Sequence, residues 1–523
     1  MRAPSTGKAT LLIASVLLAA PAARAQEGSA SERLKEAQQL YQAGQYFKSA
    51  RYAFNAIEGD PRIEAEAYSW ITLGLMRAKL PNAASYFFVK TLQSGSKPAI
   101  RRVLTQTESL LMRVGPDLLR NFLVRHTAYE DYDAVNRSSY LFSLGKEALL
   151  AGDANRAVGY LNGISDRSPV HPFALQLRGT AHALAGKNEQ ALEDFRQCDE
   201  RAAKIADAGK DEDQLRRQQA SEAEDLQARC RAGYARTLYQ MDRFEDADRA
   251  YDRIPKESLV WPDILFEHAW ASFGRAEYNR TLGKLVSYKS PALEFVWNPE
   301  IDVLRAQAYL ALCLYDDANE VVNEFNARYA QVGEEVKKFV EANASNLGAF
   351  HELGKKALSE SLYTRNGVYR MVNRFARGPY FQNLVSAERS VQLERAAAQR
   401  FGSSIPGAAS GSSGRGFPGF LEQVLSWRER TIRHLGGAFI KNSLLDHHAA
   451  LIADFEKTAF IKLEMLRRAK ERLMYKRELG LDRTRGSIEP SRRDDQYYWS
   501  FNGEFWNDEL GDYVFGLESE CRG

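Results

Sequence analysis

Small and apolar residues recur at the same places in two successive segments between Leu141 and Cys198. The matching positions are Gly145 and Gly179, Gly152 and Gly186, Ala157 and Ala191, and Leu161 and Phe195, each pair 34 residues apart. This period is typical of helix–turn–helix repeats. The glycines and alanines are expected where two antiparallel helices approach most closely, and the larger apolar side chains between neighbouring hairpins.

The pattern continues on both sides of these two copies. Downstream, Ala235, Phe244, Ala247 and Tyr251 match Ala269, Tyr278, Thr281 and Leu285, and then Ala306, Tyr315, Ala318 and Val322. Upstream, we expect one unit over residues 31–61, a degenerate one over 62–93 and a divergent helical hairpin over 98–136. The period resembles the tetratricopeptide repeat. We therefore predict an all-α fold with a tetratricopeptide superhelix, an α-solenoid of five good units and one or two degenerate ones, over residues 26–330.

A charged segment rich in Ala and Gln interrupts this array at residues 199–229, and we interpret it as a solvated extension of the neighbouring repeat helices. Cys198 and Cys230 stand at its two ends. Because the ends of such an excursion must meet, we predict a disulfide between these cysteines. Four cysteines allow three pairings, so Cys313 could bond Cys521 and tie the tail to the repeats. Alternatively, Cys313 is a small buried apolar residue.

The character of the chain changes after about residue 330. Long charged helices are expected over residues 331–401, from 334 to about 361 and from 383 to 401. A flexible Gly/Ser linker follows at 402–416, and then a helix without proline at 417–478. Gly436 and Gly437 could bend that helix. We expect its apolar stripe to pack on the preceding helices as a long helical hairpin or coiled coil.

The C-terminal segment, residues 479–523, is unusually aromatic. Its prominent rings include Trp499, Phe501, Phe505 and Trp506. Exposing so many aromatic side chains would be costly, so we expect the segment to dock in a groove. It either packs on its own chain or acts as an aromatic hook for a partner.

The N-terminus predicts export. Arg2 and Lys8 precede a short apolar run, and Ala23-Arg24-Ala25 resembles a cleavage site, so residues 1–25 are interpreted as a secretory signal peptide. The alternative, a membrane anchor, requires about 20 apolar residues. No cysteine follows the run, which disfavours a bacterial lipoprotein, and no other stretch is apolar enough to span a membrane. Cleavage would lower Lys plus Arg from 71 to 68, equal to the 68 Asp plus Glu, so no nucleic-acid role is expected.

Motifs for catalysis, cofactor binding and metal binding are not recognisable in the sequence. The eight histidines are scattered, and no P-loop, GxGxxG, CxxC or HExxH pattern occurs. The sequence GSSG at 411–414 lacks the spacing of a nucleophile elbow. We therefore expect no cofactor, no metal and no enzymatic activity. An enzyme that uses carboxylates on helices, such as a transglycosylase, is a distant alternative.

A binding surface is predicted instead, because the first helix of each tetratricopeptide hairpin lines the concave side of the superhelix. The repeat register places the following residues there: Phe142, Lys146, Gln176, Arg236, Tyr239, Phe266, Trp270 and Phe273. We expect Phe266, Trp270 and Phe273, at i, i+4 and i+7, to anchor a peptide or helix. In the alternative interpretation, one or two of these rings pack between hairpins.

Two stretches carry a further resemblance. They are Trp261-Pro262-Asp263-Ile264-Leu265-Phe266-Glu267-His268-Ala269-Trp270 with the later run from Ala308 to Asp316, and the tail from Tyr498 to Gly511. Together they resemble exported tetratricopeptide proteins of deltaproteobacteria, some of which belong to the envelope machinery of adventurous gliding motility. The resemblance implies a periplasmic or outer-membrane-associated protein that joins other envelope proteins.

These observations favour a scaffold for protein–protein assembly in the bacterial envelope, within a gliding-motility or related trans-envelope complex. Its partners would be envelope proteins that place a peptide or helix in the repeat groove; the sequence does not determine its oligomeric state. The alternative is a periplasmic adaptor or chaperone for cell-wall enzymes or outer-membrane proteins.

Overall fold

The structure is a computed structural model that describes residues 29–115, 119–209, 214–403, 416–479, 488–492, 497–499 and 503–521. The expected signal peptide and most of the expected Gly/Ser linker lie outside these ranges. Every regular element within them is a helix, so the predicted all-α class is confirmed. No helix among the described residues is long and apolar enough to cross a membrane.

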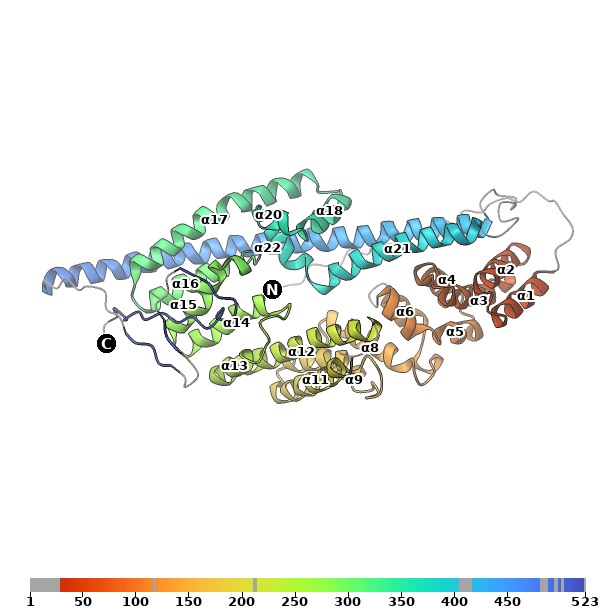
Figure 1. The fold of residues 1–523 in the computed structure, drawn as a ribbon, viewed down its shortest axis with the longest axis horizontal. Helices are drawn as coiled ribbons and strands as arrows, with labels where there is room; N and C mark the ends of the chain where they lie inside the picture. Colours follow the sequence, from red (N-terminus) through yellow and green to blue (C-terminus); the bar gives the residue numbers. More distant parts are fainter. Residues whose placement is uncertain are drawn as a thin grey trace.

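Most of the chain up to residue 342 consists of antiparallel helical hairpins (Figure 1). The hairpins are α1 (Ala30–Gln42) with α2 (Tyr46–Gly59), α3 (Glu64–Arg77) with α4 (Pro81–Gln93), α8 (Arg137–Leu150) with α9 (Ala154–Leu161), α10 (His171–Leu184) with α11 (Asn188–Gly209), α12 (Gln214–Gln240) with α13 (Phe244–Tyr251), α14 (Trp261–Gly274) with α15 (Tyr278–Val286), and α16 (Glu300–Ala311) with α17 (Tyr315–Ala342). This succession of hairpins is an α-solenoid, as the repeat period predicted.

One backbone feature recurs in every one of these hairpins. The turn between the two helices contains a residue in the left-handed region, with φ between 58° and 81°. These residues are Gly44, Lys79, Gly152, Gly186, Asp242, Ala276 and Cys313. A left-handed residue after a helix ends it and reverses the chain, and glycine takes this conformation at least cost. The glycine period seen in the sequence therefore marks only some of the turns, because other residues fill the position elsewhere.

Two glycines show why small residues recur at 34-residue spacing. A Cβ on Gly145 would lie 2.6 Å from the Leu161 side chain, and a Cβ on Gly179 would lie 3.0 Å from the Phe195 ring. In both hairpins the glycine of the first helix thus accommodates a large side chain of the second. The repeated contact accounts for the repeated pattern.

The segment between the second and third hairpins differs from the expected divergent hairpin. It forms three short helices, α5 (Lys97–Leu104), α6 (Thr107–Val114) and α7 (Arg120–His126). Gly115, with φ of 91°, ends α6, so neither of the last two helices reaches three turns. The apolar spacing predicted helices with a break at Gly115, which is present, but a further break between α5 and α6 divides the first expected helix.

The charged insertion at 199–229 extends α11 to 22 residues and α12 to 27, beyond the length of every other repeat helix except α17. The two helices run antiparallel, and Cys198 and Cys230 form a disulfide where they leave the array. Their Cα atoms are 6.0 Å apart. Both cysteines are fully buried beside Leu175 and Leu226. The bond thus holds together the base of the helical excursion, as the sequence predicted.

The expected boundary at residue 330 falls inside α17, which runs without interruption to Ala342. Phe325, Tyr329, Val332 and Val336 continue its buried stripe beyond the repeat register. The helix expected from 334 to about 361 is divided, because α17 ends and α18 (Leu347–Ala357) begins with the side chain of Asn346 accepting the Ala349 N–H. Three helices follow, α19 (Glu360–Tyr363), α20 (Gly367–Ala376) and α21 (Pro379–Ser403).

The helix α22 (Gly416–Leu479) is 64 residues long and spans about 95 Å at 1.5 Å per residue. It forms an antiparallel pair with α21 and crosses α18, α20, α16 and α17 (Figure 1). Its first turns also contact α2 and α4. The helix therefore joins the N-terminal hairpins to the C-terminal end of the array.

Aromatic rings and a buried carboxylate make the contact with the N-terminal hairpins. The Phe417 ring of α22 lies 5.6 Å from that of Phe47 and 5.1 Å from that of Phe54, centroid to centroid. On α21, the Glu394 carboxylate accepts the backbone N–H groups of Asn82 at 2.8 Å and Ala83 at 3.1 Å. It thereby caps the start of α4, where those N–H groups have no partner within the helix.

Gly436 and Gly437 lie inside α22, which continues through both. A Cβ on Gly437 would be 2.0 Å from the Leu347 carbonyl oxygen, and one on Gly436 would be 2.3 Å from Nδ1 of the buried His351. The glycine pair therefore provides the close crossing of α18 over α22. The sequence also allowed a bend at this pair, but α22 continues through it as one helix.

Gly437→Ala is expected to destabilise the protein by about 1–3 kcal/mol, because the added methyl group must displace backbone at the crossing. Gly159→Ala is the matched control, since a Cβ on this helical glycine meets no atom within 4 Å. Helix propensity should make the control up to about 1 kcal/mol more stable. Denaturant unfolding measures both changes, and a stabilising Gly437→Ala would contradict the described crossing.

Candidate functional site

The eight residues predicted for the binding surface lie on the first helices of successive hairpins. Phe142 and Lys146 lie on α8, Gln176 on α10, Arg236 and Tyr239 on α12, and Phe266, Trp270 and Phe273 on α14. Arg236 is exposed, and the others except Phe266 are half-buried. We call this set of residues the first-helix face.

The three aromatic residues of α14 form one row of rings. The Trp270 centroid lies 6.4 Å from that of Phe266 and 5.4 Å from that of Phe273. Phe266 is only 9% exposed and packs with Leu285 and Leu304 of the next helices. Phe266 is therefore a packing residue between hairpins, which corrects its assignment to the binding surface. Trp270 and Phe273 remain accessible at the edge of that cluster.

Arg236 contributes a charge to this face that is already partly neutralised. Its guanidinium donates two hydrogen bonds to the carboxylate of Glu267, at 2.7 and 2.8 Å. Glu267 lies on α14, the first helix of the following hairpin. Glu267 also accepts the Tyr251 hydroxyl at 3.2 Å. The bidentate pair joins α12 to α14 and fixes the orientation of the guanidinium. The face therefore offers aromatic edges beside an oriented ion pair.

The C-terminal segment docks on the helices of its own chain. Residues 503–521 cross the array over α13, α15 and the turn between α16 and α17, and we call them the strap. The buried Leu510 packs in one core with apolar residues of α12, α13 and α14. At its end Cys521 is bonded to Cys313, with Cα atoms 5.0 Å apart, so the second cysteine pairing considered from the sequence is present.

Two residues of α15 hold the strap by its main chain. The Asn279 side chain accepts the Leu517 N–H and donates to the Leu517 carbonyl, both at 3.0 Å. A Cβ on Gly283 would lie 1.7 Å from the Tyr513 carbonyl oxygen, so only glycine admits the strap there. Sequence analysis did not identify either residue, because an asparagine and a glycine on a helix give no pattern until the docked segment is known.

The aromatic residues of the tail divide into two groups. Phe505 is half-buried, with its ring 5.7 Å from that of Tyr513. Trp499 is 79% exposed and Trp506 is 59% exposed. Phe501 lies outside the described residues. The tail thus packs on its own chain through one group and presents the tryptophans to solvent.

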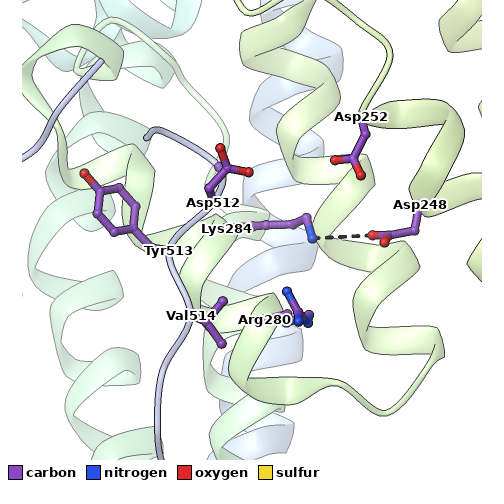
Figure 2. Close-up of a pocket in the computed structure, with 8 residues that line it drawn as sticks. Asp248, Asp252, Arg280, Lys284, Asp512, Tyr513 and Val514 are labelled. Carbon is purple, nitrogen blue, oxygen red and sulfur yellow. Dashed lines mark hydrogen bonds and ion pairs between the residues drawn. The ribbon is translucent and has the colours of Figure 1, made fainter. Parts of the chain in front are cut away.

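Beneath the strap, a buried ionic cluster joins α13, α14 and α15. Figure 2 shows its Asp248–Lys284 pair beside Asp512 and Tyr513 of the strap. Asp248 accepts hydrogen bonds from His268 Nε2 at 2.7 Å, Arg275 at 3.0 Å and Lys284 at 3.4 Å. Burial alone would raise the pKa of Asp248, but the His268 hydrogen bond and the charge of Lys284 outweigh it and lower the pKa below the usual value. Burial and Lys284 lower the pKa of His268.

Asp248, Asp252 and His268 are the group in the described part of the chain whose ligand atoms are close enough to hold a metal ion. The surrounding charges do not fit that use. Lys284 and Arg275 already neutralise Asp248, and a further cation would be repelled by both. The adjoining cavity, of about 20 Å³, has room for about one water molecule and not for a substrate. We therefore interpret the cluster as structural.

The chain matches no protein-family profile and no curated protein sequence. Among solved structures, it is similar to the crystal structure of the P58(IPK) TPR domain, at 16% identity over 57% of this chain and 93% of that chain. The TM-score is 0.19, so that likeness carries no argument. The solenoid fold is established by the hairpins, the recurring left-handed turns and the glycine contacts described above. Arrays of this kind offer extended surfaces for binding other proteins.

Proposed function

We propose that this protein is a non-enzymatic scaffold in the bacterial cell envelope, which binds other envelope proteins through the first-helix face. The observation that carries the proposal is the row formed by Trp270 and Phe273 beside the Arg236–Glu267 pair. Aromatic residues and arginine are the side chains most enriched at protein–protein hot spots. The face continues along the first helices of the array, as an extended peptide or helix requires.

An envelope location is supported by the cysteines. Disulfides persist in oxidising compartments such as the bacterial periplasm, and the two pairs join Cys198 to Cys230 and Cys313 to Cys521. The expected signal peptide at residues 1–25 points to the same compartment. The resemblance to exported tetratricopeptide proteins of deltaproteobacteria favours a place in a gliding-motility or related trans-envelope complex.

Trp270→Ala is expected to weaken partner retention by at least tenfold while leaving helical content unchanged, because it removes the accessible centre of the aromatic row. The measurement is quantitative recovery of stoichiometric envelope partners with the tagged protein, alongside circular dichroism. Leu184→Ala is the matched control, since Leu184 is 70% exposed at the end of a different first helix. If both variants recovered the partners equally well, the binding site would lie outside the first-helix face.

A further inference from the structure

From Leu444 onward, α22 has two apolar faces. One carries Leu444, Leu451, Ile461 and Met465, which are buried in the same core as α17 and α18. The other points away from that core. Its apolar side chains are Leu445, Ile452, Phe460, Leu463 and Leu466, with exposed fractions of 41%, 49%, 70%, 66% and 61%. A helix needs only one apolar face to pack on its own domain, so the second face requires a separate explanation.

The most exposed part of this second face is symmetric about Leu463. Phe460 and Leu466 lie three residues before and after Leu463, and Glu456 and Lys470 lie seven residues before and after it. At 100° per residue, all five lie within about 60° of one line along the helix. Glu456 and Lys470 are both exposed, and the structure gives neither an ion-pair partner within its described residues.

This symmetry decides which occupant fits the face. When two copies of the helix run antiparallel about a two-fold axis at Leu463, each Phe460 meets the other copy's Leu466, and each Glu456 meets the other copy's Lys470. A parallel pair would instead place Glu456 against Glu456 and Lys470 against Lys470. Glu456 lies on the same side of the helix as these apolar side chains. Binding of this face to a lipid surface would therefore draw the Glu456 carboxylate into an apolar medium.

We propose that this segment of α22, residues 456–470, is a self-association surface, through which a second copy of this chain binds in an antiparallel, two-fold symmetric contact centred on Leu463. Such a contact is isologous, because residue i of one copy meets residue j of the other and the reverse. It buries the three most exposed apolar side chains of the segment and forms two identical ion pairs. This surface is separate from the first-helix face and does not depend on its use.

The body of the molecule packs on the other side of this segment. Ile461 and Met465 are buried in a core shared with α16 and α17. Lys457 pairs with Glu300 of α16 at 2.9 Å. Phe460, Leu463 and Leu466 therefore face away from the body of their own copy.

A charge exchange in the mature full-length chain tests the pairing. Sedimentation velocity over a range of concentrations measures the monomer–dimer equilibrium. Glu456→Lys should weaken the dimer by about tenfold, because both ion pairs become lysine pairs. Adding Lys470→Glu restores both pairs with reversed polarity and should restore the dimer to within about twofold. Asp446→Lys is the control, since it makes the same charge change at an exposed position of α22 outside the segment.

A cysteine experiment tests the register directly. Leu463→Cys should give a disulfide-linked dimer on mild oxidation, whereas Glu456→Cys alone should not. Mixing Glu456→Cys with Lys470→Cys should give the linked heterodimer. A chain that is monomeric at every concentration would overturn the proposal. So would a dimer whose dissociation constant is unchanged by Glu456→Lys, or one that forms a disulfide in the Glu456→Cys variant alone. Binding of the monomer to phosphatidylglycerol vesicles that is lost in Leu463→Glu would assign the face to lipid instead.

Discussion

Asp248→Asn is expected to destabilise the protein by about 3–5 kcal/mol, because it removes the only carboxylate bonded to Lys284 within the described residues and leaves that ammonium buried without a counter-charge. Lys284 is 7% exposed, and its remaining hydrogen bond goes to the neutral Ser272 hydroxyl at 2.9 Å. Arg275 also loses an ion pair at Asp248. Urea denaturation of the parent and the variant at neutral pH measures the difference.

The same comparison has a defined pH dependence. The folded protein holds the pKa of Asp248 below the ordinary value of 3.8, since the His268 hydrogen bond and Lys284 outweigh burial. A carboxyl with a lowered folded pKa contributes stability that is fully present above its unfolded pKa and lost as pH falls through the folded value. The difference between parent and variant should therefore be constant from about pH 5 to 7 and shrink below about pH 4.

Asp246→Asn is the matched control on the same helix. Asp246 pairs with Arg243 and Arg249, and both guanidiniums are largely exposed. Exposed pairs contribute about 0–1 kcal/mol, so this variant should remain within that range of the parent. If the two asparagine variants were equally stable, the buried cluster would not hold α13, α14 and α15 together as described.

Loss of the Cys313–Cys521 disulfide is expected to release the strap and cost about 5 kcal/mol by the chain-entropy relation, because the bond closes a separation of 208 residues. The Cys198–Cys230 bond closes a separation of only 32 residues. Its loss should therefore lower the free energy of unfolding by about 1.5–2 kcal/mol less than loss of the other disulfide. Paired serine variants of each disulfide allow the comparison in thermal unfolding of otherwise identical chains.

Amide hydrogen exchange distinguishes release of the strap from general loosening. In the Cys313→Ser/Cys521→Ser variant, the Phe515 and Leu517 amides should exchange faster, because both donate their hydrogen bonds to Asn279 and depend on the docked position of the strap. In the Cys198→Ser/Cys230→Ser variant their protection should be retained. Unchanged exchange at both amides in the first variant would contradict the docking of the strap through its terminal disulfide.

The repeat array was predictable because its cause is local and repeats along the chain. A glycine such as Gly145 faces Leu161 in its own hairpin, so the requirement for a small residue recurs in the sequence at the repeat period. The Cys198–Cys230 pair was predictable for a similar reason. Both cysteines stand at the ends of one contiguous excursion, and antiparallel helices bring such ends together.

Contacts between segments distant in the chain were not predictable in the same way. The sequence Gly436-Gly437 is compatible with a bend or with a close helix crossing. The crossing is recognised only from the position of Leu347, which packs directly against Gly437 of α22. The register also placed Phe266 and Trp270 on the same surface of α14. Packing by Leu304 of the next hairpin buries one ring and leaves the other accessible, which the spacing within one helix does not reveal.

The central claim, that this chain is an envelope scaffold with defined partners, is tested most directly by cross-linking the tagged protein in intact envelopes and measuring the stoichiometry of what co-purifies. The account predicts a small set of envelope proteins recovered at fixed ratios, and loss of that set in Trp270→Ala. Recovery of many unassembled outer-membrane proteins at variable, low ratios would contradict it and favour a periplasmic chaperone.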